Sequence, residues 1–296
     1  MGLNGWLNVD KPAGMTSYGV IARIKKITGR CRIGHAGTLD PLATGVLPIA
    51  LGQATRTVEY LHQLSKNYQA DIELGSATDT YDAEGRVTFT ADPSAVTYND
   101  VVAALKPFTG IIQQTPPLFS ALKLNGRPLY ELARRGETVE IKPRTVTIYR
   151  LELIEFVTPV VRIEVECSGG TYIRSLAHDL GQTLGVGAHL KQLRRTGYGC
   201  FDITHSVTLD GLGTNEAVAA SILPLDHGLD FLPRIILDTT TAESISHGVV
   251  TAELRAQFAE GQAYRLYSAD GCLAAIADLT GTELRLKVFG DKPPGE

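Results

Sequence analysis

An aspartate in a glycine-rich run is the first candidate for chemistry. Asp40 lies in GHAGTLDPLATG, residues 34–45, where three glycines let the backbone approach a ligand closely. A carboxylate in such a loop could serve catalysis, but Asp-Pro also begins ordinary turns, and a glycine-rich loop need bind nothing. The GxxxxGK[ST] spacing of a phosphate-binding loop is missing, which disfavours a site for a nucleoside triphosphate.

A second candidate is the arginine at a predicted helix start. Arg174 follows Gly169 and Gly170 by a few residues, where the helix is expected to begin. A helix N-terminus and a guanidinium together could hold an anion, either a phosphate or a carboxylate such as Asp40. Pairing with Asp40 would favour the ionised carboxylate and lower its pKa. A purely structural cap is the simpler alternative.

Other side chains allow a functional and a structural interpretation. The ring of Tyr68 could stack on a nucleic-acid base, or it could belong to the core. His35 could be a base or a metal ligand, or a hydrogen-bonded histidine of the loop. No GxSxG motif suggests a hydrolytic serine. The four cysteines lack metal-ligand spacing, so we expect buried, reduced thiols and no metal site.

The elements that must position these residues mix strands and helices without regular βαβ alternation. This pattern predicts the α+β class, with a mixed, largely antiparallel sheet. Thr16 or Ser17 can cap a helix that ends at Gly29, and Thr97 with Asp100 resembles a capping box. The other predicted elements are strands at 5–9, 46–51, 68–74, 145–156 and 161–167, a hairpin at Asn125-Gly126, a short basic helix at 128–135, and a helix at 172–184.

The length of 296 residues predicts two domains. The run PLDHGLDFLPR, residues 224–234, has the two prolines expected of a linker. We therefore predict a first domain at 1–232 and a small β-rich, barrel-like domain at 233–296, with strands near 264–267, 273–277 and 283–288.

The net charge of −4 seems to argue against a nucleic-acid partner, yet the charge is unevenly spread. Residues 201–296 carry six Lys and Arg against fourteen Asp and Glu, whereas 121–150 carry seven against three. Basic runs at 23–32, 123–150 and 191–195 could supply a cationic face, although such runs are usually solvated surface. No signal peptide or long apolar run is apparent, so we expect a cytoplasmic protein without membrane association.

Several motifs in order resemble one known family. They are NVDKP with GMTS at 8–17, GHAGTLDPLATGVLPIALGQATR at 34–56, KNY at 66–68, PPLFSALKLNGRPLYELARRG at 116–136, GGTYIRSLAHDLG at 169–181 and AHLKQLRRTGYG at 188–199. Together they resemble the bacterial TruB family over about residues 5–205, and the 34–56 run is the most specific. The tail resembles an RNA-binding module of the PUA type more weakly.

The resemblance implies a pseudouridine synthase that isomerises uridine 55 in the T loop of tRNA, with no cofactor or metal. Asp40 matches the catalytic aspartate of the family, Arg174 would pair with it, and Tyr68 would stack on the flipped uracil. The target base must leave its stack, which costs a few kcal/mol. Whether Asp40 forms a covalent adduct or starts a glycal route stays open.

The resemblance also implies binding roles for other residues. His35 would stabilise the opened loop, Tyr172 and Leu193 would shape the uracil pocket, and Lys11 would support the loops around the site. An insertion at about 127–147 would grip the T stem-loop of tRNA through Arg127, Arg134, Arg135, Lys142 and Arg144.

The tail offers few cations that could bind RNA. Either some of these cations cluster toward the acceptor stem, or the tail adds little affinity for RNA. The chief cations of the tail are Arg234, Arg255, Arg265, Arg285 and Lys287.

Two alternatives to this activity remain. The first is a tRNA-binding or tRNA-folding module without catalysis, and the second is a guide-RNA-dependent, dyskerin-like synthase. The basic insertion and the lack of long basic extensions favour a monomeric, stand-alone enzyme with no obligatory protein partner.

Overall fold

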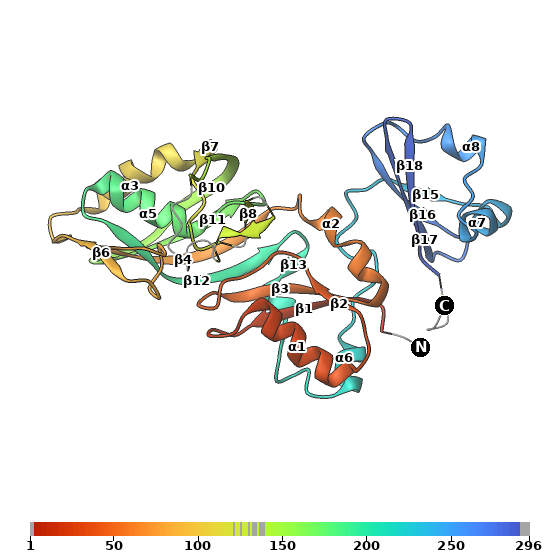
Figure 1. Ribbon diagram of the computed structural model, residues 1–296, viewed down its shortest axis with the longest axis horizontal. Helices are drawn as coiled ribbons and strands as arrows, with labels where there is room; N and C mark the ends of the chain where they lie inside the picture. Colours follow the sequence, from red (N-terminus) through yellow and green to blue (C-terminus); the bar gives the residue numbers. More distant parts are fainter. Residues whose placement is uncertain are drawn as a thin grey trace.

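The computed structural model describes residues 3–120, 122–124, 126–129, 131, 135 and 140–290, and only the backbone of 123, 124 and 128. A large sheet organises most of the chain (Figure 1). Its strands are β1 (Gly5–Lys11), β2 (Ile33–His35), β3 (Thr44–Leu51), β4 (Lys66–Leu74), β7 (Gly110–Gln114), β10 (Arg144–Val157), β11 (Val160–Cys167), β12 (Ala188–Tyr198), β13 (Phe201–Asp202) and β14 (Val207–Thr208).

The strand order is β14-β1-β3-β12-β4-β11-β10-β7, with β2 beside β3 and β13 beside β12. Neighbouring strands are antiparallel except in the pairs β1 with β14 and β3 with β12. The predicted α+β class with a mixed, largely antiparallel sheet is therefore confirmed.

The helices begin and end where their capping residues require. Helix α1 (Ser17–Thr28) is capped by Thr16, whose side chain accepts a hydrogen bond from the Gly19 amide, and it ends at Gly29 with a positive φ of 70°. Helix α3 (Tyr98–Leu105) has both hydrogen bonds of the predicted capping box. The remaining helical elements are η1 (Gly52–Arg56), α2 (Val58–Leu61), η2 (Lys106–Phe108), α5 (Ile173–Leu184), η3 (Ile203–His205), α6 (Asn215–Ala220), α7 (Thr239–Ser246) and α8 (Ala252–Arg255).

Strands β1 and β3 are buried on both faces. Leu7 of β1 and Ile49 of β3 pack in the main core with residues of α1, α3 and α5. Trp6 and Ala50, on the opposite face, join a second core that includes residues of the linker and the tail. Because successive side chains of a strand point to opposite faces, these strands lie between two layers and fix the loop that joins β2 to β3.

The two halves of the large sheet meet where β3 runs parallel to β12. The contact is short, with Arg194 opposite Thr44 and Arg195 opposite Gly45. Gly45 has a φ of 100°, and a Cβ there would lie 2.2 Å from the carbonyl oxygen of Arg195. Only glycine fits this close approach. The loop that carries Asp40 enters β3 at this junction.

Strand β12 was not among the predicted strands. Its pairing with β4 shifts register between Leu190 and Gln192 and again between Arg195 and Gly197. These irregularities break the alternation of buried and exposed residues that identifies a strand in sequence. His35 is also placed differently from the prediction, because it ends strand β2 rather than lying in a loop.

The hairpin predicted at Asn125-Gly126 is present as β8 (Lys123–Leu124) and β9 (Arg127–Pro128), although Asn125 itself is outside the described residues. The short basic helix predicted at 128–135 also falls largely outside them. A second small hairpin consists of β5 (Ser76–Thr78) and β6 (Val87–Thr90), and its loop reaches the region of Asp40.

The tail forms its own sheet, drawn in blue in Figure 1 apart from the large one. The predicted strands are present as β16 (Ala263–Tyr267), β17 (Leu273–Thr280) and β18 (Glu283–Val288), and β15 (Arg234–Ile236) adds a fourth. The order β15-β16-β17-β18 leaves β15 and β18 unpaired with each other in the described part of the chain. The expectation of a barrel-like tail is therefore wrong, since the sheet is open.

The cysteines differ in part from the expected burial. Cys167 is buried and Cys31 half-buried, but Cys200 and Cys272 are exposed. All four are thiols rather than halves of a disulfide. Cys200 follows β12 at a turn and Cys272 precedes β17, positions where the chain is at the surface.

Candidate active site

The Asp40 loop is held from beneath by buried polar side chains. The hydroxyl of Ser17, at the start of α1, donates to the Leu39 carbonyl at 3.0 Å and accepts from the Leu39 amide at 2.9 Å. The Lys11 ammonium, fully buried, donates to the carbonyls of Met15 at 2.5 Å and Pro41 at 3.3 Å. These bonds fix the backbone on both sides of Asp40.

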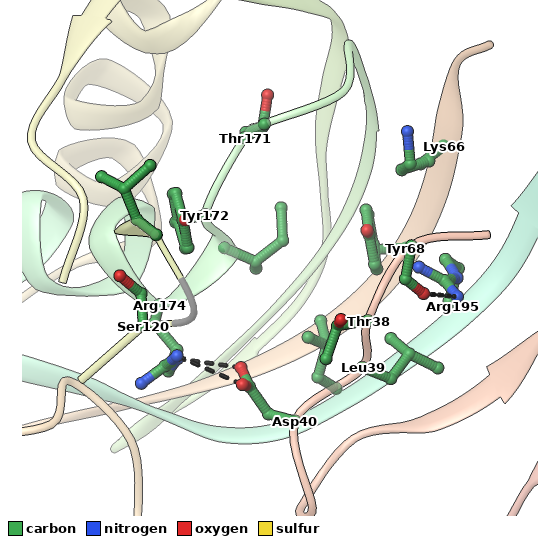
Figure 2. Close-up of a pocket in the computed structure, with 15 residues that line it drawn as sticks. Thr38, Leu39, Asp40, Lys66, Tyr68, Ser120, Thr171, Tyr172, Arg174 and Arg195 are labelled. Carbon is green, nitrogen blue, oxygen red and sulfur yellow. Dashed lines mark hydrogen bonds and ion pairs between the residues drawn. The ribbon is translucent and has the colours of Figure 1, made fainter. Parts of the chain in front are cut away.

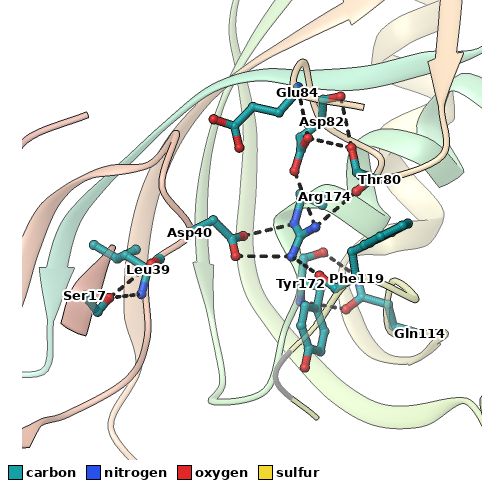
Figure 3. A network of polar contacts seen from close by, with 10 residues as sticks. All are labelled: Ser17, Leu39, Asp40, Thr80, Asp82, Glu84, Gln114, Phe119, Tyr172 and Arg174. Atoms are coloured by element: carbon teal, nitrogen blue, oxygen red, sulfur yellow. Dashed lines mark hydrogen bonds and ion pairs between the residues drawn. The ribbon is translucent and has the colours of Figure 1, made fainter. Parts of the chain in front are cut away.

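Asp40 forms an ion pair with Arg174, from the first turn of α5. Nε of Arg174 lies 3.0 Å from Oδ2 of Asp40, and Nη2 donates to Oδ1 at 3.2 Å (Figure 3). This two-point contact sets the orientation of the carboxylate as well as its distance. The two residues are 134 positions apart in the chain. The structure thus brings together the two candidates that the sequence left as separate loops.

The arginine is itself held by three further oxygens. Nη1 donates to the Thr80 carbonyl at 3.1 Å, and Nη2 donates to the Phe119 carbonyl at 3.0 Å. Nη1 also lies 3.4 Å from Oδ2 of Asp82, whose side chain is buried. Asp82 is fixed in turn by the Thr80 hydroxyl at 2.6 Å and the Glu84 amide at 3.1 Å. These contacts therefore hold Arg174 in its orientation toward Asp40 without any help from a substrate.

Asp82 was not singled out in the sequence. It lies in an ordinary polar loop between β5 and β6, with no motif around it. Only an indirect signal could have found Asp82. A buried arginine needs partners for its charge and its N–H groups, so a second carboxylate near Arg174 is a reasonable expectation.

Burial raises the pKa of Asp40, and the positive charge of Arg174 opposes this rise. The lowering of this pKa by Arg174, expected from the sequence if the two residues pair, is present but is outweighed by burial. Removal of water around the carboxyl is the larger effect, because the loop packs Asp40 against the sheet. A carboxylate that is poorly solvated but correctly oriented is well suited to react with an electrophilic carbon.

A cavity of about 370 Å³ opens in front of Asp40, within the usual range for small-molecule sites. Figure 2 shows Asp40 and Arg174 at one side of it and Tyr68, Lys66 and Arg195 at another. Residues 37–40, 170–174 and Leu193 complete most of the lining.

Tyr68 forms one wall of the cavity and is 7% exposed. Burial raises the pKa of its hydroxyl, and the charge of Arg195 opposes the rise. Arg195 stands opposite Tyr68 in the β4–β12 register. The Arg195 guanidinium donates to the carbonyls of Val46 at 2.6 Å and Gly37 at 3.1 Å, so it ties the cavity wall to the Asp40 loop. Arg195 lies within the 188–199 motif and the basic run 191–195, but the sequence analysis assigned it no role in the site.

Lys66 contributes a second buried cation to the cavity. Its ammonium donates to the Leu64 carbonyl at 3.2 Å and lies 4.3 Å from the centre of the Tyr198 ring. Burial, assisted by the nearby charge of Arg195, lowers the pKa of Lys66 to about 8. This ammonium therefore loses its charge a little above neutral pH.

Tyr172 and Leu193 both line the cavity, as the resemblance implied for a uracil pocket. The backbone of Tyr172 is fixed by Gln114, whose side chain accepts from the Tyr172 amide at 2.8 Å and donates to its carbonyl at 3.0 Å. Leu193 lies opposite Ala70 in the β4–β12 register.

Three groups of predicted residues lie outside the cavity lining. His35 is half-buried on β2, and burial lowers its pKa. Lys11 supports the Asp40 loop from below, and its pKa is lowered to about 8 by burial. Of the insertion residues, Arg127, Arg135, Lys142 and Arg144 are exposed, and Arg134 is outside the described residues.

The cations of the tail are largely engaged within the protein. Arg265 is buried and contacts Asp230 at 2.8 Å, and Lys287 pairs with Glu59. Arg285 contacts Glu283 at 3.5 Å, and Arg255 donates to the Thr282 carbonyl at 2.8 Å. Arg234 stacks over the Tyr267 ring. Arg265 and Lys287 are therefore committed to contacts within the protein, whereas Arg234, Arg255 and Arg285 remain exposed.

Two further observations bear on the kind of site. Among the residues that the structure describes, no three His, Cys, Asp or Glu side chains gather as ligands of one metal ion would. Within the same residues, no helix is both long and apolar enough to cross a membrane.

Comparison with known proteins gives consistent matches. Residues 25–173 match the family described as TruB family pseudouridylate synthase (N terminal domain), and residues 174–230 match the tRNA pseudouridylate synthase B C-terminal domain. The chain is 43% identical to tRNA pseudouridine synthase B of Dehalococcoides mccartyi, covering 99% of this chain and 98% of that protein.

Other relatives agree with these matches. The protein of the same name from Burkholderia mallei is 45% identical, with 93% of each chain covered. The fold is similar to a chain of a Cbf5-Nop10-Gar1 complex, with a TM-score of 0.70, 30% identity, and coverage of 96% of this chain and 82% of that one. The family matches, the near full-length identity and the shared fold show that the chain belongs to the TruB family of pseudouridylate synthases.

Proposed function

We propose that this enzyme converts uridine 55 of the T loop of tRNA to pseudouridine, with Asp40 as the catalytic residue. The observation that carries the proposal is a half-buried carboxylate, oriented at two points by Arg174, at the edge of a cavity with an aromatic wall. The names of the curated relatives point to tRNA as the substrate.

The reaction is an isomerisation and needs no external reductant or oxidant. The bond from uracil N1 to ribose C1′ breaks, the uracil turns, and a bond from C5 to C1′ forms. The proton on C5 is lost, and N1 gains one. Asp40 can assist either by attack on C1′ or by removal of the proton on C2′, and both routes need the ionised carboxylate.

The base must leave the loop to enter the cavity, because C1′ and C5 are not accessible in a stacked nucleotide. We propose that the flipped uracil stacks on the ring of Tyr68, with Tyr172 and Leu193 as further walls. Tyr68 would also accept or relay the C5 proton. His35, outside the lining, would act on the opened loop rather than on the flipped base.

Exposed cations of the insertion would bind the backbone of the T stem. Arg127, Arg135, Lys142 and Arg144 are all at the surface, as phosphate contacts require. We extend the proposal to Arg134, which the sequence places in the same basic run.

We also propose a cytoplasmic, monomeric enzyme that needs no protein partner, and the basic insertion supports this stand-alone action. We also retain the division at residue 232 and a PUA-like, RNA-binding role for the tail as proposals. The engaged cations of the tail argue that its share of the affinity is small.

The direct test uses purified protein and an unmodified T-arm stem-loop labelled with tritium on uracil C5. Release of tritium without guide RNA or cofactor, together with pseudouridine at position 55 by mass spectrometry, would support the proposal. Binding without release would favour the non-catalytic module. Release only after addition of a guide RNA would favour the guide-dependent synthase.

A further inference from the structure

A stacked pair of side chains lies directly behind the arginine of the site. The rings of Tyr81 and His178 are nearly parallel, with an interplanar angle of 15° and 3.9 Å between their centres. His178 lies one turn after Arg174 on α5, so both side chains project from the same face of the helix. Both members of the pair are half-buried.

The backbone of Tyr81 is strained. Its φ is 65°, and no other non-glycine residue in the described part of the chain has a positive φ. This conformation is unfavourable for a residue with a bulky side chain, and glycine or asparagine would adopt it more easily. Such strain persists only where the surroundings hold the residue in place.

The residues on either side of Tyr81 are the ones that hold Arg174. The Thr80 carbonyl accepts a hydrogen bond from Arg174 at 3.1 Å, and the Asp82 carboxylate lies 3.4 Å from the same nitrogen (Figure 3). A rotation of the Tyr81 backbone would move both oxygens at once. The Tyr81 carbonyl, which accepts from the Leu190 amide at 2.9 Å, anchors this loop to β12.

We infer that Tyr81 and His178 are positioning residues for pseudouridine formation: their stacked rings hold the strained loop that aims Arg174 at Asp40. The inference rests on the proposed function, because it assumes that Asp40 acts on the substrate. Neither ring is among the residues that line the cavity, so we assign the effect of the pair to Arg174 rather than to contact with the flipped base.

Two pairs of variants separate the ring contact from the backbone strain. His178→Ala removes the stack, whereas His178→Phe keeps a flat ring. Tyr81→Gly removes both the ring and the strain, whereas Tyr81→Phe keeps the ring and loses only the hydroxyl. If the stack matters, Tyr81→Gly is impaired in spite of its relaxed backbone. Gln182→Ala, an exposed position later on α5, serves as the control.

The expected result is a loss of turnover without a loss of RNA binding. We expect His178→Ala and Tyr81→Gly to lower kcat by about fivefold or more, with KM changed less than about twofold, because the change lies in the orientation of Arg174. His178→Phe and Tyr81→Phe should stay near the wild type. An equal loss in the phenylalanine and alanine variants, or an unchanged kcat in His178→Ala, would overturn the inference.

A double-mutant cycle tests whether the effect passes through the arginine. In an Arg174→Lys background, which lacks the forked guanidinium, His178→Ala should cost much less than in the wild type, because coupled residues are not additive. A full, independent loss in both backgrounds would mean that the stack only stabilises the fold.

Amide hydrogen exchange provides a readout that does not depend on activity. The Ala83 amide donates to the Leu190 carbonyl at 2.9 Å, so its protection reports on the loop. We expect faster exchange there in His178→Ala and recovery in His178→Phe, and unchanged protection would overturn the inference. Should the wild type form no pseudouridine, the proposed function fails, while this measurement still decides the role of the stack.

Discussion

Asp40 and Asp82 contact the same guanidinium from two sides. Oδ2 of Asp40 lies 3.0 Å from Nε of Arg174, and Oδ2 of Asp82 lies 3.4 Å from Nη1. Asp82 is buried, whereas the side chain of Asp40 is 37% exposed toward the cavity. One carboxylate therefore fixes the arginine, and the other is presented to the substrate.

Loss of the fixing carboxylate should slow the reaction without weakening RNA binding. Asp82→Asn keeps the shape of the side chain and can still accept from the Thr80 hydroxyl, but it no longer neutralises Arg174. We expect turnover to fall about tenfold, which corresponds to about 1.4 kcal/mol, at an unchanged Kd for the T-arm stem-loop. Single-turnover kinetics and filter binding would measure the two quantities. Parallel losses in rate and affinity would assign Asp82 to RNA binding instead.

The rate should fall as the pH drops through the pKa of Asp40. The reactive form is the carboxylate, and burial raises its pKa, so the acid limb should lie at higher pH than for an ordinary aspartate. Arg174→Gln removes the charge that opposes this rise and should move the limb further upward, besides slowing the reaction. Arg174→Lys keeps a charge and is the control. The pH dependence of the rate between about pH 4.5 and 8 tests this prediction. An acid limb that moves to lower pH in Arg174→Gln would contradict it.

Lys66 should make RNA affinity sensitive to pH on the alkaline side. Its pKa of about 8 means that its charge is present at neutral pH and is lost as the pH rises through that value. We expect affinity for the T-arm stem-loop to weaken between about pH 7 and 9, because a cation in the cavity attracts the RNA backbone.

Two substitutions of Lys66 distinguish its charge from its volume. Lys66→Arg stays charged throughout and should bind independently of pH, whereas Lys66→Met should bind weakly at every pH. Lys11, with a similar pKa, lies outside the cavity lining. A pH dependence that survives in Lys66→Arg would point to another group.

The exposed cations of the insertion should determine the salt dependence of binding. We expect Arg135→Ala and Lys142→Ala each to weaken RNA binding and to reduce the slope of log K against log salt by up to about 1, since each phosphate contact releases counterions. Arg162→Ala on β11 is the control, because that side chain is paired with Asp71 and Glu155 and lies outside the proposed RNA surface. Titrations of the protein with the RNA at several salt concentrations would measure these slopes. Equal slopes for the insertion variants and the wild type would remove the insertion from the RNA surface.

Local signals in the sequence predicted most elements of the fold. Thr16 and Gly29 delimit α1 through capping, and the alternating residues of β4 reveal a half-buried strand. These features depend on neighbours a few positions away. Strand β12 was missed because its register shifts interrupt the alternation, although it lies at the centre of the sheet. The open sheet of the tail could not be distinguished from a barrel, because strand order depends on long-range pairing.

The candidate site shows the same contrast between residues that local signals reveal and residues that only long-range contacts define. Asp40, Tyr68 and Arg174 were found through their motifs, and the structure places all three around one cavity. Asp82 and Arg195 were missed, since their roles depend on contacts with residues far away in the chain. The lowering effect of Arg174 on the pKa of Asp40 was expected from the sequence, but the larger effect of burial was not. Sequence can suggest a partner for a charge, but not how much water the fold removes from it.

The central claim is that the Asp40 carboxylate performs the chemistry, and Asp40→Asn tests it most directly. Burial raises the pKa of Asp40, so its charge costs folding stability above that pKa, and the asparagine variant should keep or gain in Tm at neutral pH. Asp92→Asn, an exposed loop variant, is the matched control.

The measurement is single-turnover pseudouridine formation on the unmodified T-arm stem-loop, with enzyme in excess and no guide RNA or cofactor. We predict that the wild type and Asp92→Asn modify the RNA fully, while Asp40→Asn forms no pseudouridine and binds the RNA with a Kd within about tenfold of the wild type. A folded Asp40→Asn variant that forms pseudouridine at a rate near the wild type would contradict the account.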